Sequence, residues 1–258
     1  MSLYINHNLA SNNAQRTVSG TNRSLQSSFE KVSSGLRINK AADDAAGLGV
    51  AENLNAHYRS SKIALRNTND GISVVQTAEG ATNEVSNIIK RMRELAVQSA
   101  SDTLGSTERQ YIQDEYEELA SEIVRIANIT EFNGVSLGNG DNSTLNVQVG
   151  VENTAFDRIS ITLGDLRATV LGIDTGTVDL STASGAQSAL SAFDDALDSV
   201  NAYRSDYGAT QNRLMSSLRN SEIYSENLQA AESRIRDADY AYETAEMAKY
   251  QILQSAGI

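Results

Sequence analysis

Apolar residues recur at helical spacing along most of this chain of 258 residues. In the first run, four apolar side chains between Leu25 and Leu36 fall on one side of an α-helix. A second run covers residues 44–100, a third begins at Ser106 and a fourth near Gly185. A helix of about 55 residues is about 83 Å long, whereas a compact domain of this chain length measures about 45 to 50 Å across. The pattern therefore predicts a mainly α-helical, elongated rod of long antiparallel helices with coiled-coil packing.

The apolar positions of the long runs are the candidate packing residues of the rod. Thr107-x-x-Gln110 fits a capping box after Gly105, so the third helix is expected to begin there. The fourth run keeps nearly one heptad register, and we expect it to continue unbroken to the end of the chain. The packing residues predicted for the rod are Leu54, Leu65, Ile72, Ile112, Leu119, Ile123, Leu190, Phe193 and Leu197.

The two ends of the chain are rich in Asn, Gln, Ser and Ala and carry one apolar stripe each. A helix of that composition is marginal alone, and one stripe offsets the ordering entropy only when a neighbour covers it. We therefore expect ends that are mobile in a single chain and helical in an assembly. The stripe residues are Leu25, Phe29, Val32, Leu36, Leu228, Ile235 and Ile252.

The helical spacing of apolar residues stops between residues 130 and 184. "LNVQVG" (145–150) and "ISITLG" (159–164) alternate apolar and polar residues and are bounded by turn-rich segments, which predicts one or two small β-hairpins. "TGTVDLSTASG" follows as a polar, turn-rich exit.

Composition excludes several classes of function. The chain has no Cys, which removes disulfides and thiol chemistry, and its two histidines, His7 and His57, do not make a metal site. A net charge of −12 without a basic stripe argues against nucleic-acid binding. No apolar run is long enough for a signal peptide or a membrane span. We predict no catalytic site and no cofactor. Because identical copies repel each other, any assembly must depend on apolar packing.

A short break separates the first two helical runs. "SSGLRINKAADDAAG" (33–47) holds a glycine at each end, with a basic and then an acidic cluster between them. Gly35 can end a helix and relax the backbone. Asp43 and Asp44 lie where an N-cap and a favourable dipole contact would start the next helix.

Both ends of the chain resemble bacterial flagellins, the subunits of the flagellar filament. The matching segments are "INHNLASNNAQRTVSGTNRSLQSSFEKVSSGLRINKAADDAAGLGVAENL" and "GATQNRLMSSLRNSEIYSENLQAAESRIRDADYAYETAEMAKYQIL". The resemblance implies that residues 1–43 and 222–258 form the inner-tube domain, to which the stripe residues of the two ends belong. It implies that 44–139 and 185–221 form the rod domain, with 140–184 as a short variable hairpin region on it.

The resemblance assigns the break to the spoke that joins inner tube and outer tube, with Gly35, Arg37, Asn39, Asp43 and Asp44 as its residues. Flagellins usually continue for about 20 residues past "QIL", so the resemblance also implies that the end of the inner-tube helix is missing here.

The family implies a function. Copies would polymerise into the extracellular helical filament used for swimming, after export through the flagellar type III apparatus without a cleaved signal peptide. Implied partners are other copies of the chain, an export chaperone at the C-terminal helices, and the filament cap and hook-junction proteins. A hook-filament junction protein with the same fold is the alternative.

"KRMRELAVQSAS" (90–101) resembles the segment of many flagellins that vertebrate Toll-like innate immune receptors bind. By position, Arg91, Leu95 and Glu115 match the contact residues, which are also expected to touch a neighbouring subunit in the filament. Arg91 and Leu95 are one helical turn apart, and we expect them to project from one face.

Overall fold

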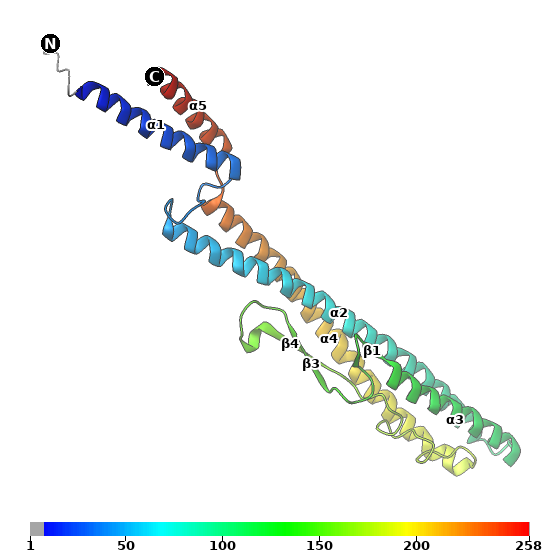
Figure 1. Ribbon diagram of the computed structural model, residues 1–258. Coiled ribbons are helices and arrows are strands. Elements are labelled where there is room, and N and C mark those ends of the chain that lie inside the picture. The colour runs from blue at the N-terminus through cyan, green and yellow to red at the C-terminus, as the bar shows by residue number, and fades with distance from the viewer. Residues whose placement is uncertain (1–7, 258) are drawn as a thin grey trace. The chain divides into compact units, whose positions relative to one another are not determined.

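The computed structural model describes residues 8–257, so His7 lies outside the described part. The fold is mainly α-helical, with two small antiparallel hairpins, as predicted (Figure 1). The helices are α1 (Leu9–Ser34), α2 (Ala45–Ser99), α3 (Ser106–Ile129), α4 (Ala183–Arg236) and α5 (Tyr240–Gly257). The strands are β1 (Glu131–Phe132), β2 (Val135–Ser136), β3 (Thr144–Gln148) and β4 (Arg158–Thr162), and a 3₁₀ turn, Ala155–Asp157, precedes β4.

The chain divides into two compact units. The terminal unit comprises residues 1–60 and 223–258, and the central unit comprises residues 61–222. Helices α2 and α4 contribute residues to both units. Among the helices of residues 8–257, none is long and apolar enough to cross a membrane.

The core of the central unit lies between α2, α3 and α4. Side chains at helical spacing on each helix are buried there, and the rings of Tyr116 on α3 and Phe193 on α4 meet edge to face, with centroids 6.1 Å apart. Arg93 pairs with Asp194, whereas Ser61 contacts Ser221. Residue numbers thus rise along α2 as they fall along α4, so these helices are antiparallel, as predicted.

The β3–β4 hairpin packs on α2 in the central unit. The predicted strands pair antiparallel, from Thr144 opposite Thr162 to Gln148 opposite Arg158. Gly71 of α2 allows the close approach, because a Cβ at this position would lie 3.0 Å from a methyl group of Val147. Gly71 therefore makes room on α2 for the hairpin.

The sequence predictions allowed for a second hairpin but did not identify its strands, β1 and β2. Its turn is Asn133-Gly134, and both residues have positive φ, 49° and 78°. Asn-Gly is the commonest sequence of the tight turn that suits the twist of two-residue hairpins. The Asn-Gly dipeptide was the sequence signal from which this hairpin could have been predicted. The strands themselves gave none, because two residues are too few to show an alternating pattern.

The segment from 163 to 182 has no regular secondary structure but supplies part of the central core. The expectation of a polar exit loop is wrong for Val178 and Leu180, which are buried, as are five earlier apolar residues of the segment: Leu163, Leu166, Ala168, Leu171 and Ile173. Polar side chains of the bundle hold its backbone in place. Gln113 accepts a hydrogen bond from the N–H of Leu180 at 2.7 Å, and Tyr116 donates its hydroxyl to the carbonyl of Ile173 at 2.9 Å.

The starts predicted for the third helix, at Ser106, and for the fourth, near Gly185, are confirmed, but the predicted cap of the third helix is wrong. Helix α3 begins at Ser106 with Gly105 as its N-cap, and within the described chain no side chain caps it, so the Thr107–Gln110 capping box does not form. Helix α4 begins slightly before Gly185, because the Thr182 hydroxyl oxygen accepts the N–H of Gly185 at 3.1 Å as an N-cap.

The expectation that the fourth helix runs unbroken to the chain end is also wrong. Helix α4 ends at Arg236, and α5 starts at Tyr240. Asp237 leaves the helix to form a β-bridge with Leu36. Asp239 then caps α5 by accepting the N–H groups of Ala241 and Tyr242 at 2.9 and 3.2 Å.

Candidate functional site

The terminal unit contains a junction where four chain segments meet, formed by residues 35–44 and 236–239. Helix α1 ends at Gly35, whose φ of 72° is left-handed and whose N–H bonds to the carbonyl of Lys31 at 2.9 Å. Glycine adopts this conformation without steric cost, so the predicted helix stop at Gly35 is confirmed.

Backbone hydrogen bonds join the two chain crossings of the junction. The N–H of Arg37 donates to the carbonyl of Arg236 at 2.7 Å, and the N–H of Ala238 donates to the carbonyl of Gly35 at 2.9 Å. The Arg37 guanidinium also donates to the carbonyl of Ile235 at 2.6 Å. The last carbonyls of a helix lack partners within the helix, so Arg37 satisfies the end of α4 with a cation at the favourable pole of its dipole.

The second half of the junction is an acid-stabilised turn. The Asp43 carboxylate accepts the N–H groups of Lys40 and Asn39, each at 3.0 Å. These two backbone hydrogen bonds lower the pKa of Asp43 below its ordinary value. The Asn39 side chain in turn donates to the Ser34 hydroxyl at 2.7 Å. The turn is therefore fixed to the end of α1.

Asp44 starts the next helix. Its carboxylate accepts the N–H of Gly47 at 2.9 Å, which is the geometry of an N-cap, so the predicted cap at this site is confirmed for Asp44. Ile38, which the sequence reasoning did not single out, is almost fully buried beside Gly47. The only sequence signal for the burial of Ile38 was that it is a β-branched apolar residue within a polar loop.

Helices α1 and α5 lie side by side and antiparallel in the terminal unit (Figure 1). Lys31, in the last turn of α1, forms an ion pair at 3.3 Å with Glu243, in the first turn of α5. Both charges suit the dipoles of their helices. Among the described residues of α1 and α5, the buried side chains are Ser28 and Glu243, both polar. The pair thus has no buried apolar core of its own.

The stripe residues of the two ends occupy different environments in the single chain. Leu228 is buried, and Leu25, Val32, Leu36 and Ile235 are half-buried. Phe29 and Ile252 are 61% and 68% exposed, and Leu253 beside Ile252 is exposed as well. The structure therefore leaves the largest apolar side chains of these stripes facing solvent.

The predicted rod-packing residues are mostly covered. Ile112, Ile123 and Phe193 are buried in the core between α2, α3 and α4, and Leu119, Leu190 and Leu197 pack against that core. Ile72 packs on the second cluster beneath the β-hairpins. Leu54 and Leu65 are half-buried on α2.

Arg91 and Glu115 form an exposed ion pair between α2 and α3. The guanidinium donates to one carboxylate oxygen of Glu115 from Nε at 3.0 Å and from Nη2 at 2.8 Å, and to Glu94 at 3.2 Å. These hydrogen bonds, above all those to Glu115, raise the pKa of Arg91 above its ordinary value.

Leu95 does not share the exposed face of Arg91, contrary to expectation. Its side chain is 1% exposed and belongs to the central core. Successive helix residues are rotated by about 100°, so Leu95 lies about 40° from Arg91, toward buried Met92 and Ser99. A surface contact in this conformation therefore uses Arg91 and Glu115 without Leu95.

Within residues 8–257, no group of three or more His, Cys, Asp or Glu side chains is arranged to hold a metal ion. The polar contacts of the junction and the buried apolar side chains of the central unit are contacts that hold helices together.

Comparison with known protein families gives two matches that together cover most of the chain. Residues 5–143 match the bacterial flagellin N-terminal helical region, and residues 190–258 match the bacterial flagellin C-terminal helical region. The chain is 44% identical to a flagellin of Halalkalibacterium halodurans over 98% of this chain and 93% of that protein. It is 39% identical to the flagellar filament 33 kDa core protein of Treponema phagedenis over 99% of this chain and 93% of that protein.

Solved structures give the same fold. The crystal structure of Bacillus cereus flagellin is 32% identical and superposes with a TM-score of 0.54, over 60% of this chain and 88% of that one. A putative flagellar hook-associated protein from Vibrio parahaemolyticus superposes with a TM-score of 0.62 over 76% of this chain and 100% of that one. At 15% identity, the second likeness shows a common fold only.

Proposed function

Because the chain belongs to the bacterial flagellin family, we propose that it assembles into the flagellar filament by burying the apolar stripes of α1 and α5 between copies. Membership in the family makes the chain a structural filament protein and not an enzyme. The proposal concerns how the copies hold together and which residues carry the contact.

One observation carries this proposal: the α1–α5 pair buries Ser28 and Glu243 but leaves Phe29 and Ile252 mostly exposed. A helix pair without an apolar core gains little from its own packing. Full burial of an exposed side chain of this kind contributes about 1.5 to 3 kcal/mol, and Phe29, Ile252 and Leu253 are 61%, 68% and 49% exposed, so covering what remains would contribute roughly 3 to 5 kcal/mol per copy. The ordering of the two helices offsets part of that gain.

The test is polymerisation of the purified chain at high salt, measured by pelleting and electron microscopy. Salt screens the mutual repulsion of copies that carry a net charge of −12. We expect Phe29→Ser and Ile252→Ser to reduce the pelleted fraction. Val170→Ser is the matched control, because it removes an exposed apolar side chain from the central unit. Equal assembly of all three variants and the unchanged chain would contradict the proposed contact.

The partners outside the filament follow from the same stripes. We propose that the chain leaves the cell through the flagellar type III apparatus and that an export chaperone covers α5 before export. Tyr240, Tyr242 and Ile252 are exposed along α5 in the single chain. This exposure supports a chaperone that covers α5 before the chain assembles. Filament cap and hook-junction proteins are the expected neighbours at the ends of the polymer.

A Toll-like receptor contact at Arg91 and Glu115 is a further part of the proposal. Both side chains are exposed and joined by two hydrogen bonds, which supports their use as a recognition surface. We expect Arg91→Ala to reduce receptor activation in a reporter-cell assay. Arg125→Ala is the control, because it removes another exposed arginine that pairs on the helix surface. Equal activation by both variants would exclude this contact.

The hook-filament junction protein remains the second candidate, supported by the common fold with the Vibrio parahaemolyticus protein. The pelleting experiment separates the two functions. A filament subunit adds copies without limit, whereas a junction protein stops at a few copies.

A further inference from the structure

An open groove of about 560 Å³ lies in the central unit between the β3–β4 hairpin and α4. Phe156, at the end of the hairpin, lines this groove and is 96% exposed. Arg158 lines it from β4, and Asn212, Arg213 and Ser216 line it from α4. An exposed aromatic side chain next to arginines is the composition that is enriched in the contact residues of protein interfaces.

The groove is basic in an otherwise acidic molecule. Arg158 donates to the neutral side-chain amides of Gln148 and Asn153, which leave its charge uncompensated. Along α4, residues 207–221 contain two arginines and no acidic residue. Across residues 8–257, no carboxylate forms an ion pair with Arg158 or Arg213.

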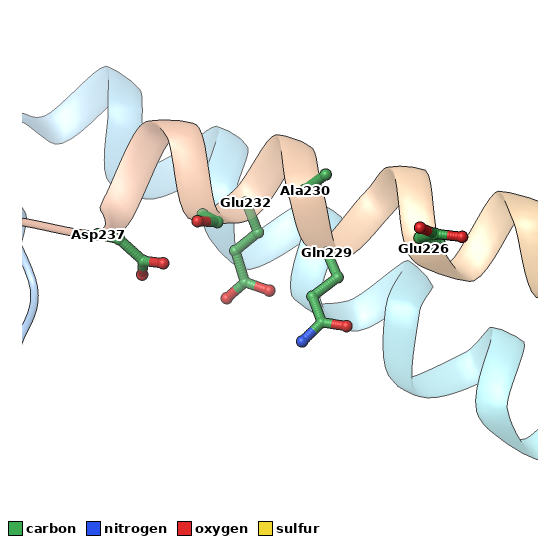
Figure 2. Close-up of a pocket in the computed structure, with 6 residues that line it drawn as sticks. Glu226, Gln229, Ala230, Glu232 and Asp237 are labelled. Carbon is green, nitrogen blue, oxygen red and sulfur yellow. The ribbon is translucent and has the colours of Figure 1, made fainter.

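An acidic hollow lies in the terminal unit, along the last three turns of α4 (Figure 2). Glu226, Glu232 and Asp237 line it together with Gln229, Ala230 and Ser233, and the described lining includes no basic residue. Figure 2 shows Gln229, Glu232 and Asp237 extending from the same side of the helix. Glu232 accepts a hydrogen bond from Asn55 at 2.8 Å and lies 3.9 Å from Arg236, so part of its charge is already compensated.

We propose that the basic groove of one copy binds the acidic hollow of the next copy in the filament, with Arg213 facing Glu226 and Phe156 buried as the apolar anchor. The proposal rests on the proposed assembly and names two surfaces that meet in it. Copies with a net charge of −12 repel each other at long range. A contact that matches a basic patch with an acidic one removes this repulsion locally and sets the orientation of the incoming copy.

The two surfaces differ, so the contact is heterologous. A heterologous contact leaves a free groove at one end and a free hollow at the other after every addition. When the rotation between copies does not close a ring, such a contact generates an open helical filament. The pairing thus gives every copy the same orientation along the filament.

The experiment exchanges the charges. Arg213→Glu places a carboxylate opposite Glu226, and Glu226→Arg places an arginine opposite Arg213. Each variant alone therefore sets two like charges against each other and should raise the critical concentration for assembly about tenfold or more. An equimolar mixture of the two variants should co-assemble, because each copy then offers complementary surfaces to the other kind. The double variant Arg213→Glu/Glu226→Arg should also assemble, with the two charges reversed. Circular dichroism of each monomer checks that its helices are intact.

Matched controls separate local from overall charge. Arg66→Glu, exposed on α2 outside the groove, and Glu222→Arg, exposed on α4 outside the hollow, change the net charge by the same amounts. Both controls should assemble as the unchanged chain does. Phe156→Ala should weaken assembly without changing the charge.

The outcomes distinguish this inference from the proposed function. If the unchanged chain does not polymerise, the assembly proposal fails and this pairing fails with it. If Arg213→Glu and Glu226→Arg polymerise as well as their controls, the filament proposal stands and the pairing is overturned. If both single variants fail and neither the mixture nor the double variant recovers assembly, the pairing is overturned as well. Recovery in both establishes it.

Discussion

Replacing Tyr116 by Phe tests how the irregular segment from 163 to 182 is held on the helices. Tyr116 is fully buried on α3 and donates its hydroxyl to the carbonyl of Ile173 at 2.9 Å. Burial raises the pKa of the Tyr116 phenol well above its ordinary value, so the hydroxyl stays protonated and remains a donor at neutral pH. The hydroxyl can therefore donate this hydrogen bond throughout the neutral pH range.

The expected magnitude follows from what the substitution leaves behind. The Phe ring keeps the edge-to-face contact with Phe193, at a centroid distance of 6.1 Å, so the loss of apolar packing is small. The carbonyl of Ile173 loses its buried donor, and an unsatisfied buried acceptor costs about 1 to 3 kcal/mol. We therefore expect Tyr116→Phe to lower the free energy of unfolding of the central unit by about 1 to 3 kcal/mol.

The assay is urea unfolding of the monomer, followed by circular dichroism. Tyr111→Phe is the matched control, because it makes the same change on the same helix at a side chain that is 68% exposed. Its effect should stay within about 0.5 kcal/mol. The reasoning fails if the two variants unfold at the same urea concentration with unchanged slopes, since the buried hydroxyl would then contribute nothing.

Three further outcomes follow from the placement of single residues. Leu95→Ala should lower the free energy of unfolding by about 2 to 5 kcal/mol in the same urea assay, because it leaves a cavity in the central core, and a surface role would predict almost no change. Asp44→Ala should cost about 0.5 to 2 kcal/mol and speed amide exchange at Gly47, which loses its acceptor; unchanged exchange there would contradict the N-cap. The pKa of Asp43 is lowered in the folded chain, so its contribution is present above its ordinary value of 3.8 and is lost as the pH falls through the lower folded value. The amide of Asn39 should therefore stay protected on acidification to pH 3.8 and open below it, whereas in Asp43→Asn it should show no such transition.

Local chemistry in the sequence was enough to place the long helices and the main hairpin. The stop at Gly35 and the start after Asp44 depend on backbone groups within four residues, which a sequence displays directly. The alternating residues of β3 and β4 also marked the two strands, and the structure then paired these strands with each other.

The features that the sequence concealed depend on partners far along the chain. Nothing in the heptad register of α4 marks Arg236 as its end, because the break depends on the bridge between Asp237 and Leu36, some 200 residues away. Val178 and Leu180 lie in a segment of turn residues, and their burial depends on Gln113 and Tyr116 holding the backbone of this segment.

Leu95 shows the same division at the scale of one helical turn. The sequence by itself determined that residues 90–99 are helical and that Arg91 and Leu95 lie on adjacent turns. Only the tertiary structure decided that one of them is a surface residue and the other a core residue. The boundary between surface and core is set by where α3 and α4 cover α2, and a rotation of about 40° around the helix axis is enough to cross it.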